Sequence, residues 1–166
     1  ASVTHPPILT LAEKLVAIMP TSLTKAFFAD SGSGAVEVAL KMSLQYWQQS
    51  GQTQKTKFIS LEHGYHGETV GSLAVTDIPL FSEQYKDLIV SQIRIPSPAH
   101  IFSPDDIPAQ LHEQKSLDAL ERILAEKSRD ICAIILEPLV QGAAGMAMYS
   151  ANYLLGVAKL AHHYHI

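Results

Sequence analysis

An apolar run gives way to glycine and serine, and then to a helical pattern, in the segment Phe27-Phe28-Ala29-Asp30-Ser31-Gly32-Ser33-Gly34-Ala35-Val36-Glu37-Val38-Ala39-Leu40-Lys41. Apolar residues recur with the spacing of one helix face at Val36, Leu40, Leu44 and Trp47. This order predicts a strand, a tight turn and a helix whose free amides and positive dipole end face the turn. An anion such as the phosphate of a small molecule binds well there, and the Ser33 hydroxyl can add a hydrogen bond.

Other glycine motifs fit this turn less well. The dinucleotide fingerprint requires glycine or alanine at the position of Glu37, and the phosphate loop of nucleotide hydrolases requires Gly-Lys-Ser/Thr, which is absent. The hydrolase elbow requires a glycine two residues before and two after a serine, which neither Ser31 nor Ser33 has. Two readings stay open: the acidic-glycine loop of methyltransferases that bind S-adenosylmethionine, and a serine-capped helix start without a ligand.

Composition predicts a globular protein with a core of its own. The chain has 166 residues, of which 47% are hydrophobic and 17% charged, and this length favours one domain. The net charge of -4 provides no basic field for nucleic acid, and no apolar run is long enough to span a bilayer. The single cysteine, Cys132, lies in an apolar run and is expected to be a buried thiol. Because residues 1–7 also lack a signal-peptide pattern, we expect a soluble, cytoplasmic protein.

Strand and helix patterns alternate along the whole chain. We expect helices over residues 8–19, 32–49, 71–76 and 153–165 and around 117–124, and strands over residues 25–30, 57–61, 89–95 and 131–136. Residues 77–86 are expected to be irregular and residues 96–108 to form a long exposed loop. Glu37 and Lys41 are expected to form a solvated ion pair on the second helix. The alternation predicts an α/β fold with a mainly parallel sheet and helices on both faces.

A second glycine-rich turn follows the strand over residues 57–61 and reads Glu62-His63-Gly64-Tyr65-His66-Gly67-Glu68-Thr69. Loops that follow parallel strands line the ligand crevice, so this turn should lie near the first one. Tyr65 is then placed to stack on a flat ligand ring, or simply packs on its neighbours. His63 and His66 are three residues apart, but beyond Glu62 or Glu68 no further ligand is evident, and we therefore predict no metal site.

A third loop follows the apolar strand over residues 131–136 and runs from Glu137 to Gly145. A carboxylate at the end of a buried strand, before a glycine-rich loop, is well placed to orient a ligand or a neighbouring residue. A strand-capping glutamate that accepts hydrogen bonds from backbone amides explains the position equally well.

With these three loops, the sequence resembles the class III, fold type I aminotransferases, which use pyridoxal 5'-phosphate. The resemblance covers nearly the whole chain except residues 96–113. It rests on Asp30-Ser31-Gly32-Ser33, Ala35-Val36-Glu37-Val38-Ala39-Leu40-Lys41-Met42, Gly64-Tyr65-His66-Gly67 and Glu137-Pro138-Leu139-Val140-Gln141-Gly142-Ala143-Ala144-Gly145-Met146. Within the family, Tyr46-Trp47 and the third loop running into Tyr149 resemble the biotin-synthesis branch.

The resemblance implies a role for six residues. Gly32 and Ser33 would bind the cofactor phosphate, and Tyr65 would stack beside the pyridine ring and border the substrate. His66 and Glu137 would support the cofactor site from its edge. Glu68 would lie near the substrate amine, although the biotin branch often has the shorter aspartate there.

The biotin branch transfers an amino group from S-adenosylmethionine to 8-amino-7-oxononanoate, and the family is homodimeric with active sites at the subunit interface. The lysine that binds the cofactor covalently and the aspartate at the pyridine nitrogen have no match in this sequence. We therefore expect residues 1–166 to be part of a large cofactor-binding domain that does not catalyse alone, with the remainder of that domain and the small domain absent. The alternatives are another class III aminotransferase, a methyltransferase-like domain and a non-catalytic fold fragment.

Overall fold

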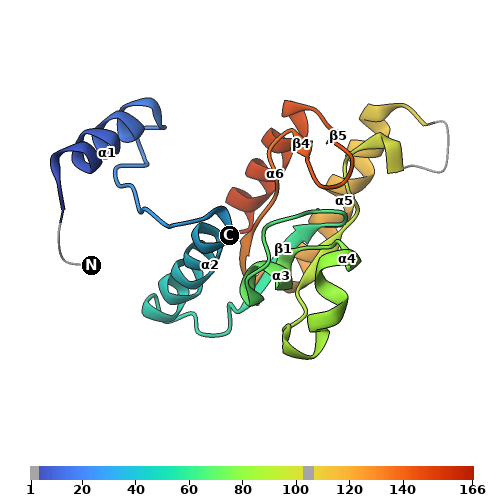
Figure 1. Cartoon of the computed structure of the whole chain (residues 1–166). Coiled ribbons are helices and arrows are strands. Elements are labelled where there is room, and N and C mark those ends of the chain that lie inside the picture. Colours follow the sequence, from blue (N-terminus) through green and yellow to red (C-terminus); the bar gives the residue numbers. More distant parts are fainter. Residues whose placement is uncertain (1–3, 103–106) are drawn as a thin grey trace. The chain divides into compact units, whose positions relative to one another are not determined.

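The computed structural model describes residues 4–102 and 107–166, in two compact units that meet between Asp30 and Ser31. Residues 1–3, part of the segment searched for a signal peptide, and residues 103–106, in the proline-rich loop, lie outside the described part. The elements are α1 (Pro6–Ile18), α2 (Gly32–Gln49), β1 (Lys57–Leu61), α3 (Val70–Val75), α4 (Pro79–Ser82), η1 (Glu83–Leu88), β2 (Ile93–Ile95), η2 (His100–Phe102), α5 (Ala109–Lys127), β3 (Ile131–Ile134), β4 (Val140–Gln141), β5 (Ala147–Met148) and α6 (Ala151–His163) (Figure 1).

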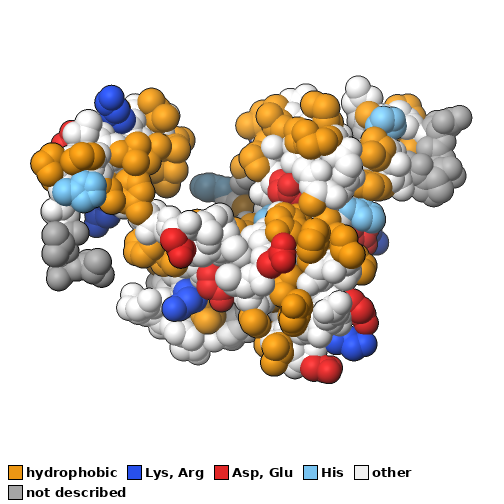
Figure 2. Space-filling view, in the orientation of Figure 1, with side chains coloured by type: hydrophobic (Ala, Val, Ile, Leu, Met, Phe, Trp, Pro, Cys, Tyr) orange, Lys and Arg blue, Asp and Glu red, His pale blue; other side chains and the backbone are white. Residues whose placement is uncertain are grey.

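The first unit is built around the amphipathic helix α1. Two prolines open this helix, where a missing backbone N–H costs nothing, and its chain continues as irregular backbone after Ile18. No residue of α1 is buried, and apolar side chains such as Leu9 and Leu11 are exposed. Hydrophobic side chains therefore cover much of the visible surface of this unit (Figure 2).

The second unit contains a three-stranded parallel sheet with β1 at its centre and the order β2-β1-β3. Both pairings are parallel, and Ile59 of β1 lies opposite Ile93 of β2 and Ile134 of β3. Because neighbouring side chains of a strand point to opposite faces, Ile59 and Leu61 lie on one face and Phe58 on the other.

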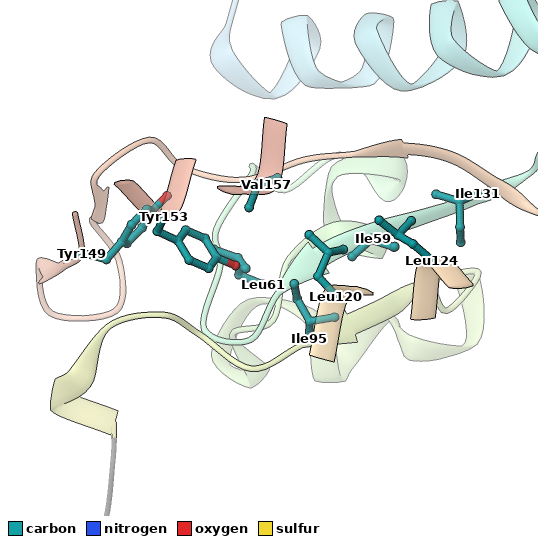
Figure 3. Packing of buried hydrophobic residues seen from close by; sticks show 9 residues of the cluster. All are labelled: Ile59, Leu61, Ile95, Leu120, Leu124, Ile131, Tyr149, Tyr153 and Val157. Carbon is teal, nitrogen blue, oxygen red and sulfur yellow. The ribbon is translucent and has the colours of Figure 1, made fainter. Parts of the chain in front are cut away.

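One face of the sheet is covered by α5 and α6 (Figure 1). Figure 3 shows the buried side chains of this layer in a row that runs from Tyr149 and Tyr153 to Ile131. Tyr153 is fully buried, and its hydroxyl lies 2.9 Å from the Ser116 hydroxyl of α5, which donates in turn to a backbone carbonyl. The tyrosine thus buries its ring without leaving its polar end unpaired.

The other face of the sheet is covered by α2 and α3. Phe58, Val75 and Cys132 form a small buried cluster, against which α2 packs the apolar residues Val36, Leu40, Leu44 and Trp47. The indole Nε1 of Trp47 donates a 2.6 Å hydrogen bond to the carbonyl oxygen of Cys132 in β3. The α/β fold, the parallel sheet, the helices on both faces and the buried thiol are all confirmed.

Three expected strands differ from the structure, and the one expected over residues 131–136 ends at Ile134. Residues 25–30 have apolar strand-like character, yet they form no strand, because no described strand pairs with them and a strand needs a hydrogen-bonding neighbour. The strand expected over residues 89–95 is limited to Ile93–Ile95, the residues that face β1. Residues 77–86 were expected to be irregular, but residues 79–86 of them lie in α4 and η1.

The proline-rich loop is also less exposed than expected in its first part. Ser97, Pro98 and Ala99 are buried, and the Ser97 hydroxyl accepts a 3.2 Å hydrogen bond from the Ala99 amide. Among residues 4–102 and 107–166, no helix has both the length and the apolar character needed to cross a bilayer.

The central strand should be the most sensitive part of the core. Replacing Ile59, which is fully buried, by alanine removes packing from both neighbouring strands and the helix layer. We expect Ile59→Ala to lower the free energy of unfolding by about 2–5 kcal/mol in a urea titration. Leu80→Ala is the control, since Leu80 is 83% exposed and should change stability by less than about 0.5 kcal/mol. Equal losses in both variants would contradict this assignment of the core.

Candidate functional site

The N-terminus of α2 presents free backbone donors. Ser31 is the N-cap residue: its Oγ accepts a 3.0 Å hydrogen bond from the Gly34 amide, and its carbonyl oxygen accepts one of 2.9 Å from Ala35. The amides of Gly32 and Ser33 are the first two of the helix and have no acceptor within the described part of the chain. Gly32 is exposed, and a Cβ atom added there would meet no other atom within 4 Å.

The Ser33 hydroxyl joins this helix end to the second loop. Its Oγ accepts hydrogen bonds from the Glu68 amide at 2.9 Å and the Thr69 amide at 3.0 Å. A Cβ atom at Gly67 would overlap the same oxygen, which shows how closely the loop approaches α2. Because both lone pairs of the hydroxyl are used, the group at Ser33 that remains free to bind an anion is its amide.

Tyr65 and Glu68 form a pair at the surface of the second loop. The Tyr65 hydroxyl donates a 2.9 Å hydrogen bond to Oε1 of Glu68, and its ring packs against Phe81 with 5.1 Å between centroids. The hydrogen bond to the carboxylate raises the pKa of Tyr65, since ionisation would remove the donor and place two negative charges together. The pair thus presents an aromatic ring beside an acidic group.

Glu137 ties the third loop to the second. Its carboxylate accepts a 2.9 Å hydrogen bond from the Tyr65 amide and a 2.8 Å bond from the Gly142 amide. Its backbone carbonyl accepts a hydrogen bond from the Tyr149 hydroxyl. The glutamate therefore fixes the backbone of Tyr65 at the carboxyl end of the sheet.

His66 lies at the inner edge of this cluster. Its amide donates a 3.0 Å hydrogen bond to Thr76 Oγ1, and its ring Nε2 is buried without a hydrogen-bond partner among the described residues. Burial lowers the pKa of His66 because it penalises the imidazolium, although the nearby Glu137 carboxylate opposes this shift. At neutral pH the ring is therefore a neutral group.

His63 turns away from His66. Its amide binds Asp77 Oδ2 at 2.9 Å, and its ring stacks on Phe102 with 4.0 Å between centroids. Within residues 4–102 and 107–166, no group of three or more His, Cys, Asp and Glu side chains is placed to hold a metal ion.

The six residues singled out from the sequence lie in one cluster. Hydrogen bonds link Ser33 to the Glu68 amide, Glu68 to the Tyr65 hydroxyl and the Tyr65 amide to Glu137, while Gly32 and His66 adjoin these residues in the chain. The second loop therefore lies near the first, as predicted, and the third loop contacts the second, as the family resemblance implied. The binding roles of these residues are taken up below as proposals.

The contacts of two residues beside the cluster of six were not predicted from the sequence. The surface ion pair between Glu37 and Lys41 is wrong, because the Glu37 carboxylate instead binds Thr69 and Ser72. Glu37 lies one helical turn after Ser33 and so shares its side of α2, but its partners are more than 30 residues away in the sequence. Gln141 is fully buried and donates a 2.8 Å hydrogen bond to the Glu62 carbonyl, a contact that no spacing in the sequence indicates.

A cavity of about 610 Å³ lies elsewhere in the second unit, between α5, the hairpin of β4 and β5 and the start of α6. Tyr149 and Tyr153 form part of its wall, and Glu113 accepts hydrogen bonds from the amide and hydroxyl of Ser150 at its rim. It shares no residue with the cluster of six.

Comparison with known proteins identifies the family. A model of the family "Aminotransferase class-III" matches residues 1–166. The chain belongs to the class III aminotransferases. This membership confirms the resemblance of the three loops and excludes the methyltransferase reading of the glycine turn.

Relatives of this class III chain share one name. It is 41% identical over 160 residues to adenosylmethionine-8-amino-7-oxononanoate aminotransferase of Anoxybacillus flavithermus, covering 96% of this chain and 35% of that protein. It is 42% identical over 156 residues to the enzyme of that name from Helicobacter pylori, covering 93% of this chain and 33% of that protein. The chain thus spans about a third of the length of these relatives.

Solved structures of aminotransferases have the same fold as this class III chain. The enzyme of that name from Methanocaldococcus jannaschii matches with a TM-score of 0.85 and 33% identity, covering 99% of this chain and 34% of that one. The omega transaminase from Pseudomonas jessenii in complex with PMP matches with a TM-score of 0.90 and 32% identity, covering 100% of this chain and 37% of that one. The expected transferase fold is confirmed.

The pairing of Tyr65 with Glu68 predicts a measurable titration. In Glu68→Ala the pKa of Tyr65 should fall toward the ordinary value for tyrosine, because both the hydrogen bond and the neighbouring charge are lost. The measurement is a pH titration of phenolate absorbance, with Tyr65→Phe subtracted to isolate this one residue. An unchanged Tyr65 titration in Glu68→Ala would contradict the pairing.

Proposed function

We propose that this chain forms the phosphate-binding part of a pyridoxal 5'-phosphate-dependent aminotransferase. The observation that carries the proposal is the pair of free amides at Gly32 and Ser33, which lie at an open helix N-terminus beside the loop of Tyr65. Backbone donors at the positive end of a helix dipole suit a phosphate dianion, so the residues present fit this cofactor.

Each side chain of the cluster has a distinct task in this proposal. The Tyr65 ring lies beside the pyridine ring of the cofactor, and Glu137 and His66 hold the Tyr65 backbone and the inner wall in place. Burial lowers the pKa of His66, so the ring adds no positive charge beside the cofactor at neutral pH. When bound, the cofactor supplies the electron sink that amino-group transfer between two substrates requires.

Glu68 is the proposed contact for the substrate amine. Its carboxylate already accepts a hydrogen bond from Tyr65, and a cationic ammonium group can share the same carboxylate. Tyr65 then orients Glu68 and borders the substrate at the same time. Glutamate instead of aspartate at this position moves the charge outward by one methylene group.

The proposed substrates are S-adenosylmethionine as amino donor and 8-amino-7-oxononanoate as acceptor. Relatives about 40% identical to this chain carry the name of that activity. The covalent lysine of the family is not matched among the nine lysines here, so we propose that catalysis requires residues outside this sequence.

We further propose that the complete protein is a cytoplasmic homodimer. Exposed apolar side chains support an interface: α1 buries none of its residues, and Val70, Leu88 and Val90 are exposed in the second unit. A single, buried, free cysteine is compatible with a reducing compartment.

Another class III aminotransferase is the second candidate. Omega and amine transaminases match the fold at a TM-score of 0.90, slightly above the 0.85 of the enzyme from Methanocaldococcus jannaschii. Their similarity extends over the whole chain, so the fold alone does not decide between another class III aminotransferase and the enzyme that uses S-adenosylmethionine as amino donor.

The role of the Gly32 amide can be tested by removing only that donor. Gly32 is the first residue of α2, where proline is tolerated, and Ser31 before it is already extended. We expect Gly32→Pro to fold normally but to weaken binding of pyridoxal 5'-phosphate about tenfold or more, measured by equilibrium dialysis, because one charge-assisted hydrogen bond is lost. Gly32→Ala, which keeps the amide in open space, is the matched control.

Pyridoxal without the phosphate serves as the second control and should bind all three proteins equally weakly. If Gly32→Pro bound pyridoxal 5'-phosphate as tightly as the unmodified chain, the amide would have no role in binding. If the unmodified chain did not prefer the phosphorylated compound, the proposed function would be contradicted.

The substrates can be tested in a protein of full family length that carries this sequence. With S-adenosylmethionine as donor and 8-amino-7-oxononanoate as acceptor we expect turnover, and Glu68→Gln should raise the KM for the acceptor more than it lowers kcat. The reason is that the lost charge binds the amine and takes no part in proton movement. Turnover with other amino donors but none with S-adenosylmethionine would favour the second candidate.

A further inference from the structure

Glu37 makes a contact that neither the cofactor phosphate nor the substrate requires. It is half-buried in α2, one turn after Ser33. Its Oε2 accepts a 2.6 Å hydrogen bond from the Thr69 hydroxyl and one of 3.2 Å from the Ser72 amide. A side chain on one helix thus holds the end of the second loop and the beginning of α3.

The start of α3 lacks a side-chain cap of its own. Thr69 is its N-cap residue, but the Thr69 hydroxyl forms no capping hydrogen bond within the helix. The Ser72 amide, at the third position of α3, is instead satisfied by Glu37 from α2. Such an unpaired helix amide is normally satisfied by the N-cap side chain, so Glu37 performs this task from a separate element.

The fit around the carboxylate is close. A Cβ atom at Gly71 would lie 2.6 Å from both Glu37 oxygens, so a side chain there would displace the carboxylate from this contact. The Ser72 hydroxyl donates a 3.1 Å hydrogen bond to the Ser33 carbonyl, which adds a second contact between the two helices. Ser33 and Glu37 therefore act together as acceptors for the segment Glu68–Ser72.

This segment sets the position of the proposed substrate contact. The Glu68 and Thr69 amides bind Ser33, and the Thr69 hydroxyl binds Glu37, so α2 holds two successive amides and one side chain of this segment. Glu68 in turn accepts a hydrogen bond from the Tyr65 hydroxyl. The distance between the free amides of α2 and the Tyr65–Glu68 pair is thus fixed by these hydrogen bonds.

We propose that Glu37 is a positioning residue that holds the Tyr65–Glu68 pair at a fixed position relative to the free amides of α2. The functional meaning of that position rests on the proposed function, whereas the structural role of Glu37 does not. The carboxylate acts as a hydrogen-bond acceptor, and the amide oxygen of glutamine can accept the same two bonds.

The test is amide hydrogen exchange of the 166-residue chain without any ligand. In Glu37→Ala the Glu68, Thr69 and Ser72 amides should exchange about tenfold faster or more, because their segment loses its anchor on α2. In Glu37→Gln the exchange should stay within about threefold of the unmodified chain, because the acceptor is retained. Glu121→Ala, which removes an exposed carboxylate on α5, should change none of these rates.

The Ile59 and Leu61 amides of β1 provide the internal reference and should be unaffected in every variant. Unchanged exchange of the Glu68–Ser72 segment in Glu37→Ala would overturn the proposal. Equal acceleration of that segment and β1 would also overturn it, since Glu37 would then only contribute to overall stability.

Pyridoxal 5'-phosphate is added in a separate arm of the experiment. In the unmodified chain it should slow exchange of the Gly32 and Ser33 amides, and Glu37→Ala should require a higher concentration for the same protection. Absence of protection in the unmodified chain would contradict the proposed function alone, because the ligand-free exchange decides the role of Glu37.

Discussion

The arrangement of the site depends on one oxygen atom, the Oγ of Ser33, which accepts hydrogen bonds from the amides of Glu68 and Thr69. Each of these hydrogen bonds joins the helix that follows the glycine turn to the loop that follows β1. A side chain at Gly67 would collide with this oxygen, so the close approach requires glycine there. The first turn of α2 is thereby attached to the second loop, while the two amides at its tip stay free.

This division between occupied and free groups gives the site its chemistry. The side chains of Ser33, Glu37 and Glu137 are used as internal acceptors, and they organise the loops before any ligand arrives. Pre-organised donors bind a ligand without the cost of ordering the chain at that moment. In the proposed function, two backbone amides and one aromatic ring on these ordered loops form the cofactor site.

The sequence predicted the α/β class and the parallel sheet, because periodicity reports local conformation, and it predicted that the first two loops lie near each other, because both follow expected strands. The place of the third loop in the site was implied only by the family resemblance. It did not predict the partners of Glu37 or Gln141, because these contacts join segments far apart in the chain. The strand expected over residues 25–30 was wrong for a related reason, since local sequence does not show which segments lie side by side. Its residues have suitable character, but a strand exists only where a second strand lies beside it.

The central claim is that the free amides of α2 bind the phosphate of pyridoxal 5'-phosphate. The most direct measurement is the amide resonance of Gly32 and Ser33 in a nuclear magnetic resonance titration with this compound. The account predicts that these two resonances shift the most, and that pyridoxal without phosphate leaves them in place. Shifts of equal size with pyridoxal, or shifts confined to other regions such as the cavity beside α5 and α6, would contradict it.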